Sequence, residues 1–310
     1  MIYLSDTELE ALLPPELLIT SVREAMLWDE QNPGNVPQRI HVNKGENTYL
    51  TMPAFGPGFH GTKMVSVVPS NAGKGLPVIS GMYMLFDSAT GETLARTGAG
   101  KLTALRTGAI AAVAAEQLAD KDITTAGIIG CGVQGIQSAR LLPFVRPLKK
   151  LYILSRSRTS IENFREQLNN SHPNLPLEEC QRAEEILEAT DTVITATTSA
   201  TPVLPDDEKL LNGKCLIALG AYRRDMQELP PAAARLSECI LIDAEGTRNE
   251  TGDLRGPVET GIVGENQIFT LGKLMLGTRT LTANTRVFKS AGYALFDLFA
   301  ASAAWKNRGR

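Results

Sequence analysis

Three glycines with nucleotide-binding spacing lie between a predicted strand and a predicted helix. Residues 126–135 read Ala-Gly-Ile-Ile-Gly130-Cys-Gly132-Val-Gln-Gly135, which is the pattern G-x-G-x-x-G. In a dinucleotide site Gly130 permits a tight turn, Gly132 lets the backbone approach the pyrophosphate, and Gly135 lets the helix lie close to the strand. The start of the helix then presents unpaired N–H groups and its positive dipole end to the phosphates. The sequence therefore predicts a bound dinucleotide.

The residues after the next predicted strand bear on which dinucleotide is bound. Strand 151–154 runs into Ser155-Arg156-Ser157-Arg158, which contains no carboxylate. A free ribose 2′-hydroxyl is usually held by Asp or Glu at this point, whereas a 2′-phosphate suits Arg and hydroxyl groups. We therefore expect Ser155, Arg156 and Ser157 to bind the cofactor, with NADP(H) preferred and NAD(H) possible. The alternative is that Arg156 and Arg158 are a solvated surface pair.

Two basic residues lie where the hydrophobic pattern asks for apolar ones. In the predicted helix 101–119, Arg106 lies in the middle of the apolar stripe. A buried guanidinium is costly unless an anion pairs with it, so Arg106 needs either a structural Asp or Glu or a bound carboxylate. In the predicted strand 62–67, alternation puts Lys63 on the same face as valines. The alternative for this lysine is that its stem extends to solvent.

The elements that position these residues fall into two regions. Between residues 38 and 96, short apolar runs punctuated by Gly, Pro and Asn predict β-structure. Beyond residue 122, strands and helices alternate as in a parallel sheet with crossover helices. The predicted strands of this sheet are 126–129, 151–154, 192–196, 215–219 and 240–242. The last residues, 287–310, are predicted to form a terminal helix, and the fold class is α/β.

Composition excludes several classes of protein. The 310 residues are 43% hydrophobic and 21% charged, as in a folded globular protein. The formal net charge of -3 provides no polycationic surface, so nucleic acid is not an expected partner. No apolar run reaches the roughly 18 residues of a membrane helix, and acidic residues near the start are unlike a signal peptide. We therefore expect a cytoplasmic protein without a membrane partner.

The cysteines show no pattern typical of a metal site or of dense disulfides. Cys131, Cys180, Cys215 and Cys239 are widely separated, and none belongs to a C-x-x-C pair. The sequence therefore predicts reduced, mostly buried thiols and no metal site.

Taken in order, the motifs resemble the ornithine cyclodeaminase/mu-crystallin family. The resemblance spans nearly the whole chain and rests on Gln38-Arg39, Thr51-Met-Pro53, Gly61-Thr-Lys63, Thr103-Ala-Leu-Arg106-Thr107, Gly130-Cys-Gly132, Thr195-Ala-Thr-Thr-Ser199 and Phe288-Lys-Ser-Ala-Gly292. It implies a homodimer with a Rossmann-type doubly wound parallel sheet at residues 119–286. It also implies a split α+β substrate-binding and dimerisation domain, formed by residues 1–118 with 287–310. The implied substrate is a small amino acid, imino acid or cyclic ketimine.

The resemblance also implies which residues form the site. Arg39 and Arg106 would bind the substrate carboxylate, Met52 would contact the substrate, and Lys63 would be the catalytic acid/base group. For the cofactor, the implied residues are Thr107, Gly130, Gly132, Val133, Gln134, Gly135, Thr195, Ala196, Thr197, Ser199, Gly220, Ser290 and Gly292. Ser290 and Gly292 would lie near the nicotinamide end.

One departure from the family pattern bears on the reaction. Family members that eliminate ammonia carry a catalytic Asp shortly after the glycine of the loop 219–229, and here Tyr222 occupies that position. The segment is similar to the ketimine-reductase version, with Arg224 in place of a proline. Asp225 is displaced by three positions, so we expect it to be mainly a loop residue, with an acid role left open.

We therefore predict NAD(P)H-dependent reduction of a small cyclic imino acid of the pyrroline-2-carboxylate or piperideine-2-carboxylate type. Three alternatives stay open. The chain could be an amino-acid dehydrogenase or opine-type synthase, which would use the same residues. It could be an ornithine cyclodeaminase, which consumes no net NAD(P)H, or a non-enzymatic NADPH-dependent protein that binds a small ligand.

Overall fold

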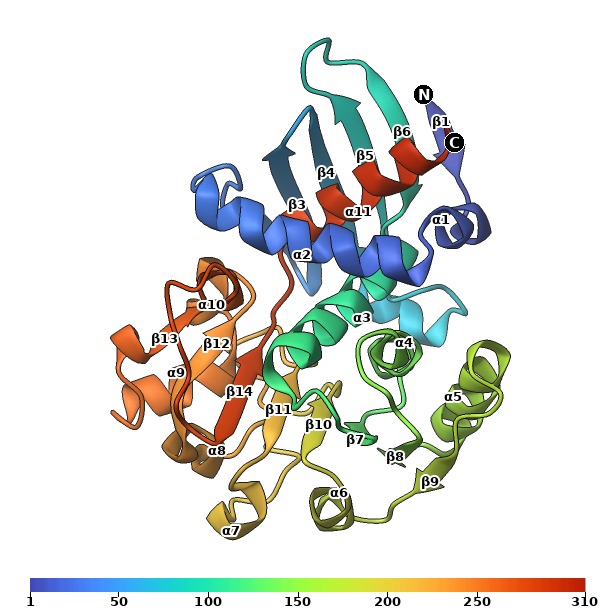
Figure 1. The fold of residues 1–310 in the computed structure, drawn as a ribbon. Helices are drawn as coiled ribbons and strands as arrows, with labels where there is room; N and C mark the ends of the chain where they lie inside the picture. Colours follow the sequence, from blue (N-terminus) through green and yellow to red (C-terminus); the bar gives the residue numbers. More distant parts are fainter. Residues whose placement is uncertain (310) are drawn as a thin grey trace. The chain divides into compact units, whose positions relative to one another are not determined.

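The chain forms two compact units (Figure 1). A computed structural model describes residues 1–309, apart from the side chain of Ala72. The first unit comprises Met1–Arg106 and the chain from Tyr293 onward, and the second comprises Thr107–Gly292. Within residues 1–309, the first unit contains a sheet of six strands and the second a sheet of eight. We call these the mixed sheet and the parallel sheet.

The mixed sheet has the strand order β1-β6-β5-β4-β3-β2, in which β1 pairs parallel to β6 and the other neighbours are antiparallel. Its strands are β1 (Ile2–Leu4), β2 (Ile40–Lys44), β3 (Asn47–Gly56), β4 (Phe59–Val67), β5 (Ile79–Asp87) and β6 (Thr93–Gly98). The 3₁₀ turn η1 (Pro69–Gly73) connects β4 to β5. The β-structure predicted between residues 38 and 96 is confirmed.

Helices cover one face of the mixed sheet. They are α1 (Asp6–Leu12), α2 (Pro15–Gln31) and α11 (Ala294–Asn307). Ser5 and Glu8 form a capping box at the start of α1, and Pro15 begins α2, where its fixed φ suits the first helical position. Helix α11 is buried along most of its length and packs against α2 and against β3, β4 and β5 (Figure 1).

The parallel sheet has the strand order β13-β12-β14-β11-β10-β7-β8-β9. Its strands are β7 (Thr125–Ile129), β8 (Lys150–Leu154), β9 (Leu177–Glu179), β10 (Thr192–Thr195), β11 (Cys215–Ala218), β12 (Ser237–Ile242), β13 (Ile268–Thr270) and β14 (Thr285–Lys289). The chain runs from β7 outward to β9 and then returns to the other side of β7 as β10. This reversal is the topological switch point, where open α/β sheets bind ligands at the carboxyl ends of their strands.

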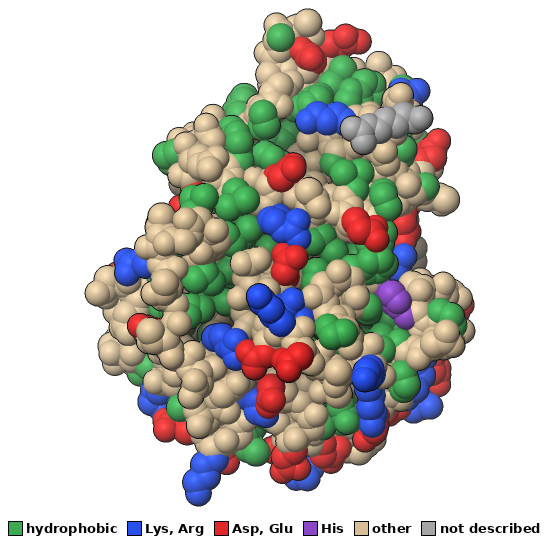
Figure 2. All heavy atoms as spheres, in the orientation of Figure 1, with side chains coloured by type: hydrophobic (Ala, Val, Ile, Leu, Met, Phe, Trp, Pro, Cys, Tyr) green, Lys and Arg blue, Asp and Glu red, His purple; other side chains and the backbone are tan. Residues whose placement is uncertain are grey.

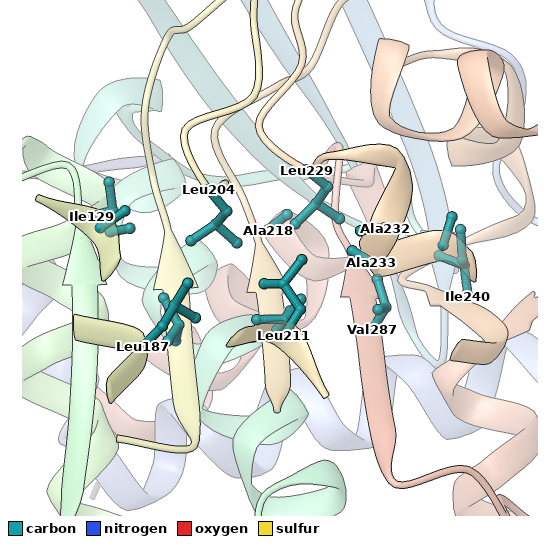
Figure 3. Packing of buried hydrophobic residues seen from close by; sticks show 14 of the residues in the cluster. Ile129, Leu187, Leu204, Leu211, Ala218, Leu229, Ala232, Ala233, Ile240 and Val287 are labelled. Atoms are coloured by element: carbon teal, nitrogen blue, oxygen red, sulfur yellow. The ribbon is translucent and has the colours of Figure 1, made fainter. Parts of the chain in front are cut away.

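The parallel sheet is flanked by helices whose apolar side chains meet those of the strands. Helix α3 (Ala99–Leu118) leads into this unit, and the helices that follow are α4 (Val133–Leu141), η2 (Leu142–Phe144), α5 (Arg158–Ser171), α6 (Ala183–Ala189), α7 (Glu208–Leu211), α8 (Pro231–Leu236), η3 (Glu245–Asn249), α9 (Gly252–Glu259), η4 (Glu265–Gln267) and α10 (Leu271–Met275). Figure 3 shows Leu187, Leu211 and Ala232 of α6, α7 and α8 in one buried layer with Ile129, Ala218 and Val287 of the sheet. Burial of such side chains stabilises the fold by roughly 25 cal/mol per Å² of apolar surface. The ends of the strands are therefore held on a packed core.

The five strands predicted for the parallel sheet are confirmed, but the prediction of a helix over residues 287–310 is wrong at its start. Residues 285–289 form β14, which pairs with β11 and β12, and α11 begins only at Ala294. The run Val-Phe-Lys is too short for its periodicity to distinguish a strand from a helix. The unit boundaries move accordingly. The second unit extends to Gly292, not to residue 286, and it begins at Thr107, inside α3.

The surface and the cysteines agree with the composition. All four cysteines are buried free thiols, and burial raises the pKa of Cys131 and Cys215 to about 12. Figure 2 shows acidic and basic side chains interspersed over the face that it draws. Among the helices of residues 1–309, none is long and apolar enough to cross a bilayer. A cytoplasmic location stays a prediction.

Candidate functional site

Lys63 lies on the face of the mixed sheet that the helices cover. Alternation along β4 places Gly61 and Lys63 on this buried face. The direct cross-strand neighbours of Lys63 are Met52 on β3 and Tyr83 on β5, and both are buried. The Lys63 side chain is only 5% exposed, so the alternative in which its stem extends to solvent is wrong.

Asp297 on α11 supplies the anion that both buried cations require. Its Oδ2 lies 2.7 Å from Nζ of Lys63, and its Oδ1 lies 3.2 Å from Nε of Arg106. The Arg106 side chain is 6% exposed and that of Asp297 is 0% exposed. Of the two anions that could serve Arg106, the structure therefore supplies the structural carboxylate.

Asp297 was not predicted from the sequence, although a signal for it was present. Asp297 is the only carboxylate in residues 287–310 and lies between the apolar pairs Leu295-Phe296 and Leu298-Phe299. An aspartate in an apolar helix needs a cation for the same reason that Arg106 in an apolar stripe needs an anion.

The ion pairs leave N–H groups of both cations unused. Within residues 1–309, the Lys63 ammonium donates to Asp297 and to Oγ1 of Thr103 at 3.3 Å, so one of its three N–H groups remains. The Arg106 guanidinium donates from Nε, and its Nη atoms donate to no residue in that range. A free guanidinium edge of this kind matches a carboxylate with two parallel hydrogen bonds. The cluster can therefore receive a small carboxylate next to a proton donor.

The charges around Lys63 bring its pKa toward neutrality. Burial disfavours the charged form and is the largest cause of a pKa lowered to about 8, while Asp297 opposes the shift and Arg106 and Arg39 add to it. Burial alone would raise the pKa of Asp297, but the charges and hydrogen bonds of Lys63 and Arg106 bring it below its ordinary value. A group whose pKa lies near 8 can both hold and release a proton at physiological pH. Arg39 is half-buried and acts on Lys63 through its charge.

Tyr83 adds a neutral hydroxyl to this row of side chains. Its Oη is buried and has no hydrogen-bond partner among residues 1–309. Burial, together with the charge of Asp297, raises the pKa of Tyr83 well above its ordinary value, so the hydroxyl keeps its proton. A Cβ on residue 61 would lie 2.1 Å from this oxygen. Gly61 is therefore required for the ring of Tyr83 to occupy its position.

Of the three glycines after β7, Gly130 and Gly135 have the steric roles that the sequence predicts, and the role of Gly132 stays a prediction. Gly130 adopts φ +106°, a conformation that other residues rarely accept. A Cβ on Gly132, the N-cap of α4, would have no atom within 4 Å, whereas one on Gly135 would lie 2.0 Å from the carbonyl oxygen of Gly130. The open approach at Gly132 and the N–H groups at the start of α4 fit a pyrophosphate.

The two arginines of the segment after β8 have different surroundings. Arg158 pairs with Glu179 at 3.1 Å and so behaves as the surface residue of the alternative interpretation. Arg156 is exposed and forms no ion pair within the described chain. Ser157 caps α5 with its side chain, and its N–H lies 3.4 Å from Oγ of Ser155. Arg156 therefore remains available to an anion.

The other residues predicted to bind the cofactor all belong to the second unit, most of them where strands end. They are Thr195, Ala196, Thr197 and Ser199 at the end of β10, Gly220 after β11, Ser290 and Gly292 after β14, Val133 and Gln134 at the start of α4, and Thr107 in α3. The sheet order makes β14, β11 and β10 neighbours, so these ends lie on one edge.

Asp243, which sequence reasoning missed, fixes the loop after β14. Its Oδ2 accepts hydrogen bonds from Oγ of Ser290 at 2.6 Å and from the N–H of Gly292 at 2.9 Å. The hydroxyl proton of Ser290 is therefore directed at Asp243, and its oxygen remains an acceptor. The signal was an aspartate directly after a predicted buried strand.

The loop after β11 presents Tyr222 and Asp225 to solvent. Tyr222 is 46% exposed, and the guanidinium carbon of Arg223 lies 5.8 Å from its ring centre. The Asp225 carboxylate pairs with Arg223 at 3.1 Å, and its side chain is 71% exposed. An exposed pair of this kind contributes about 0 to 1 kcal/mol. This geometry agrees with the prediction that Asp225 is mainly a loop residue.

Comparisons with known proteins find relatives of this chain along most of its length. The model of the ornithine cyclodeaminase/mu-crystallin family matches residues 4–308. A delta(1)-pyrroline-2-carboxylate reductase of Bacillus cereus is 35% identical over 263 residues, which are 83% of this chain and 80% of the relative. The structure of Thermococcus litoralis delta(1)-pyrroline-2-carboxylate reductase in complex with NADH and L-proline superposes with a TM-score of 0.90 at 30% identity, covering 99% of this chain and 97% of that one. An archaeal alanine dehydrogenase dimer with bound NAD superposes with a TM-score of 0.88 at 26% identity, covering 98% and 95%.

Proposed function

Because the chain belongs to the ornithine cyclodeaminase/mu-crystallin family, we propose that it is a nicotinamide-dependent imine reductase that converts a small cyclic imino acid into the cyclic amino acid. The observation that carries the proposal is the buried cluster of Lys63, Arg106 and Asp297, in which both cations keep unused N–H groups. The name of the Bacillus relative and the L-proline in the Thermococcus structure support a substrate of the pyrroline-2-carboxylate type. Piperideine-2-carboxylate has the same functional groups and belongs to the same class.

The cluster of Lys63, Arg106 and Asp297 would bind the carboxylate of the substrate. Lys63 and Arg106 together bring one positive charge more than Asp297 neutralises, so one further carboxylate completes the charge balance of this cluster. The Nη groups of Arg106 would hold it with parallel hydrogen bonds, and Met52 beside Lys63 would contact the apolar ring of the substrate. Orientation of this kind can contribute on the order of 7 to 11 kcal/mol to lowering the barrier.

Lys63 provides the proton. Its remaining N–H group would donate to the imine nitrogen, which makes the neighbouring carbon more electrophilic. The nicotinamide, when bound, supplies the hydride that adds to this carbon. The C=N double bond becomes a single bond, the nitrogen keeps the proton from Lys63, and the lysine recovers a proton from water. Asp297 stabilises the protonated lysine before transfer.

We infer that both nicotinamide cofactors bind and that NADP(H) is preferred. The glycine turn at Gly130 and Gly132 would receive the pyrophosphate common to both. Arg156 is the group that would distinguish a 2′-phosphate, since it is exposed and forms no ion pair in the part of the chain that the structure describes. The solved relatives with NADH and NAD support binding of the cofactor without the phosphate.

A second copy of the chain is the proposed partner. The face of the mixed sheet opposite Lys63 carries exposed large apolar side chains, which are Ile40, Val42, Tyr49, Phe55, Met64 and Met82. Strand register places Ile40, Met64 and Met82 in one row across β2, β4 and β5. An exposed group of large apolar side chains on one sheet face is typical of an interaction site, and the archaeal alanine dehydrogenase dimer supports assignment of that site to self-association.

The deciding experiment is nicotinamide oxidation across a substrate panel. We expect NADPH and NADH absorbance to fall with pyrroline-2-carboxylate or piperideine-2-carboxylate. The archaeal alanine dehydrogenase supports one alternative, so pyruvate with ammonia belongs in the panel. Oxidation with that mixture alone would favour an amino-acid dehydrogenase. Formation of proline from ornithine without net absorbance change would favour a cyclodeaminase, and cofactor binding without any turnover would favour a binding protein.

A further inference from the structure

The second unit contains a buried ionic cluster whose three members were not themselves assigned to substrate or cofactor. Glu228 and Lys289 are 0% exposed, and Asp253 is 2% exposed. Nζ of Lys289 lies 3.0 Å from Oδ2 of Asp253 and 3.8 Å from Oε2 of Glu228. Apolar residues of similar volume are often at least as stabilising as buried ions, so stability alone does not explain this cluster.

The carboxylate of Glu228 joins two loops at the carboxyl edge of the parallel sheet. Its Oε1 accepts hydrogen bonds from the N–H of Thr197 at 2.7 Å and from Oγ1 of Thr197 at 2.9 Å. Its Oε2 accepts from the N–H groups of Gly220 at 2.6 Å and Ala221 at 3.2 Å. Thr197 follows β10 and Gly220 follows β11. Each carboxylate oxygen therefore holds one of the two loops.

The two loops meet backbone to backbone at Gly220. A Cβ on this residue would lie 1.9 Å from the carbonyl oxygen of Thr197 and 2.3 Å from its nitrogen. Such distances exclude every residue except glycine unless the loops separate. The close approach and the bridge through Glu228 therefore belong to one arrangement.

Asp253 and Lys289 hold Glu228 in place. Oδ1 of Asp253 accepts hydrogen bonds from the backbone N–H groups of Glu228 at 2.7 Å and Leu229 at 2.8 Å. Lys289 is the last residue of β14, the neighbour of β11 in the sheet. The cluster thus links the ends of β10, β11 and β14, which are neighbouring strands of the sheet (Figure 1).

We propose that Glu228, held by Asp253 and Lys289, is a positioning residue for the dinucleotide. It fixes the loops after β10 and β11 in the conformation that receives the cofactor. The inference rests on the proposed function only in that Thr197 and Gly220 belong to the cofactor site. Loops that are already fixed lose less conformational freedom on binding, so the cofactor is held more tightly.

Glu228→Gln tests this role because the amide can serve only one loop. Its carbonyl oxygen can accept from one set of N–H donors, while its NH₂ group faces the donors of the other. We expect the dissociation constant of NADH, measured by fluorescence titration, to rise on the order of tenfold, equivalent to about 1.4 kcal/mol. The KM for the cofactor should rise with it, and kcat at saturating cofactor should change much less.

Thr285→Val is the matched control, at the opposite end of β14. The Thr285 hydroxyl accepts from the N–H of Gly213 at 2.9 Å and donates to the carbonyl of Leu211 at 3.3 Å. This variant also breaks a buried loop attachment, so its melting temperature should fall. Its dissociation constant for NADH should equal that of the wild type, because the attachment lies at the amino edge of the sheet.

Glu228→Gln with a lowered melting temperature but wild-type NADH binding would overturn the inference. If that variant does not fold, Asp253→Asn replaces it, since the amide oxygen keeps both backbone hydrogen bonds while the oxygen that faces Lys289 becomes an uncharged NH₂ group. It should weaken NADH binding severalfold, and unchanged binding again overturns the inference. A wild-type protein that binds neither NADH nor NADPH would overturn the proposed function itself, and the role of Glu228 with it.

Discussion

The ammonium of Lys63 and the carboxylate of Asp297 lie 2.7 Å apart, with 5% and 0% of their side chains exposed. Arg106 shares the same carboxylate at 3.2 Å. One buried anion thus offsets the cost of burying two cations, and its own pKa stays low because both cations contact it. Asp297 therefore favours the charged form of Lys63 and pairs with Arg106, the two groups that we propose to protonate and bind the substrate.

The pH dependence of the reaction follows from this pair. Imine reduction needs Lys63 protonated, so kcat/KM should fall as the pH rises through about 8, the pKa of that lysine. Asp297 raises this pKa by favouring the charged form, and Asp297→Asn should therefore move the basic limb to lower pH. The measurement is kcat/KM against pH with the same imine for both proteins.

Asp191→Asn is the control for the pH profile. This aspartate also pairs with a lysine, Lys214, but its side chain is 73% exposed and it belongs to the second unit. The basic limb of kcat/KM against pH for Asp191→Asn should coincide with that of the wild type. If the basic limb does not move in Asp297→Asn, a group other than Lys63 determines its position.

Lys63→Met tests whether the lysine transfers a proton or only binds. If it donates the proton, kcat should fall on the order of 10² to 10⁴-fold, with a smaller rise in KM. If it only binds the carboxylate, KM should rise while kcat holds. Lys74→Met, on an exposed lysine of the connection between β4 and β5, should match the wild type. Wild-type kcat/KM in Lys63→Met would remove Lys63 from the site.

Arg106 has a structural partner and unused donors, and two substitutions separate these roles. Arg106→Leu leaves Asp297 with Lys63, so we expect a loss of about 1 to 3 kcal/mol in the free energy of unfolding. Activity should fall much further, because the guanidinium fork is gone. Arg106→Lys can restore the pairing with Asp297 without the fork, so stability should recover while KM stays high.

Denaturant unfolding and steady-state kinetics on the same preparations provide both readouts. Recovery of KM together with stability in Arg106→Lys would mean that one point charge suffices for the substrate. A Leu variant with wild-type KM would mean that Arg106 is purely structural.

Features that depend on residues close together in the chain could be predicted from the sequence, whereas contacts between distant residues could not. The turn at Gly130 and the alternation of strands and helices are set by residues close in the chain, and both were predicted. The partner of Arg106 lies 191 residues away and that of Lys63 lies 234 residues away. The position of Arg106 in an apolar stripe indicated that an anion was needed, but not that one carboxylate on the last helix serves both Arg106 and Lys63. Strand β14 was missed because its apolar run is too short to distinguish a strand from a helix, and only its pairing with β11 and β12 identifies it.

Arg156→Ala tests the preference between cofactors. If Arg156 binds the 2′-phosphate, kcat/KM with NADPH should fall on the order of 10 to 100-fold, while kcat/KM with NADH changes little. Arg158→Ala is the matched control, because Arg158 is tied to Glu179 and should leave the ratio of the two cofactors unchanged. A wild-type enzyme that uses NADH as well as or better than NADPH would reject the preference.

The exposed apolar face of the mixed sheet predicts a dimer that a single charged substitution on that face should dissociate. Met64 is 52% exposed and lies in the row that runs from Ile40 to Met82, so a carboxylate there would be buried against the partner's apolar surface. Burial of an unpaired charge costs several kcal/mol, enough to shift a micromolar sample toward monomer. We expect light scattering to report a dimer for the wild type and a monomer for Met64→Glu.

Phe144→Glu distinguishes loss of this face from a general effect of added charge. Phe144 is 44% exposed, nearly as much as Met64, but it belongs to η2 in the second unit. It should remain dimeric, and near-ultraviolet circular dichroism of both variants should match the wild type, because neither side chain is part of a core. A wild-type protein that is monomeric at micromolar concentration would contradict self-association. If Met64→Glu and Phe144→Glu dissociate to the same extent, the effect is not specific to the exposed face of the mixed sheet, and that face is not identified as the interface.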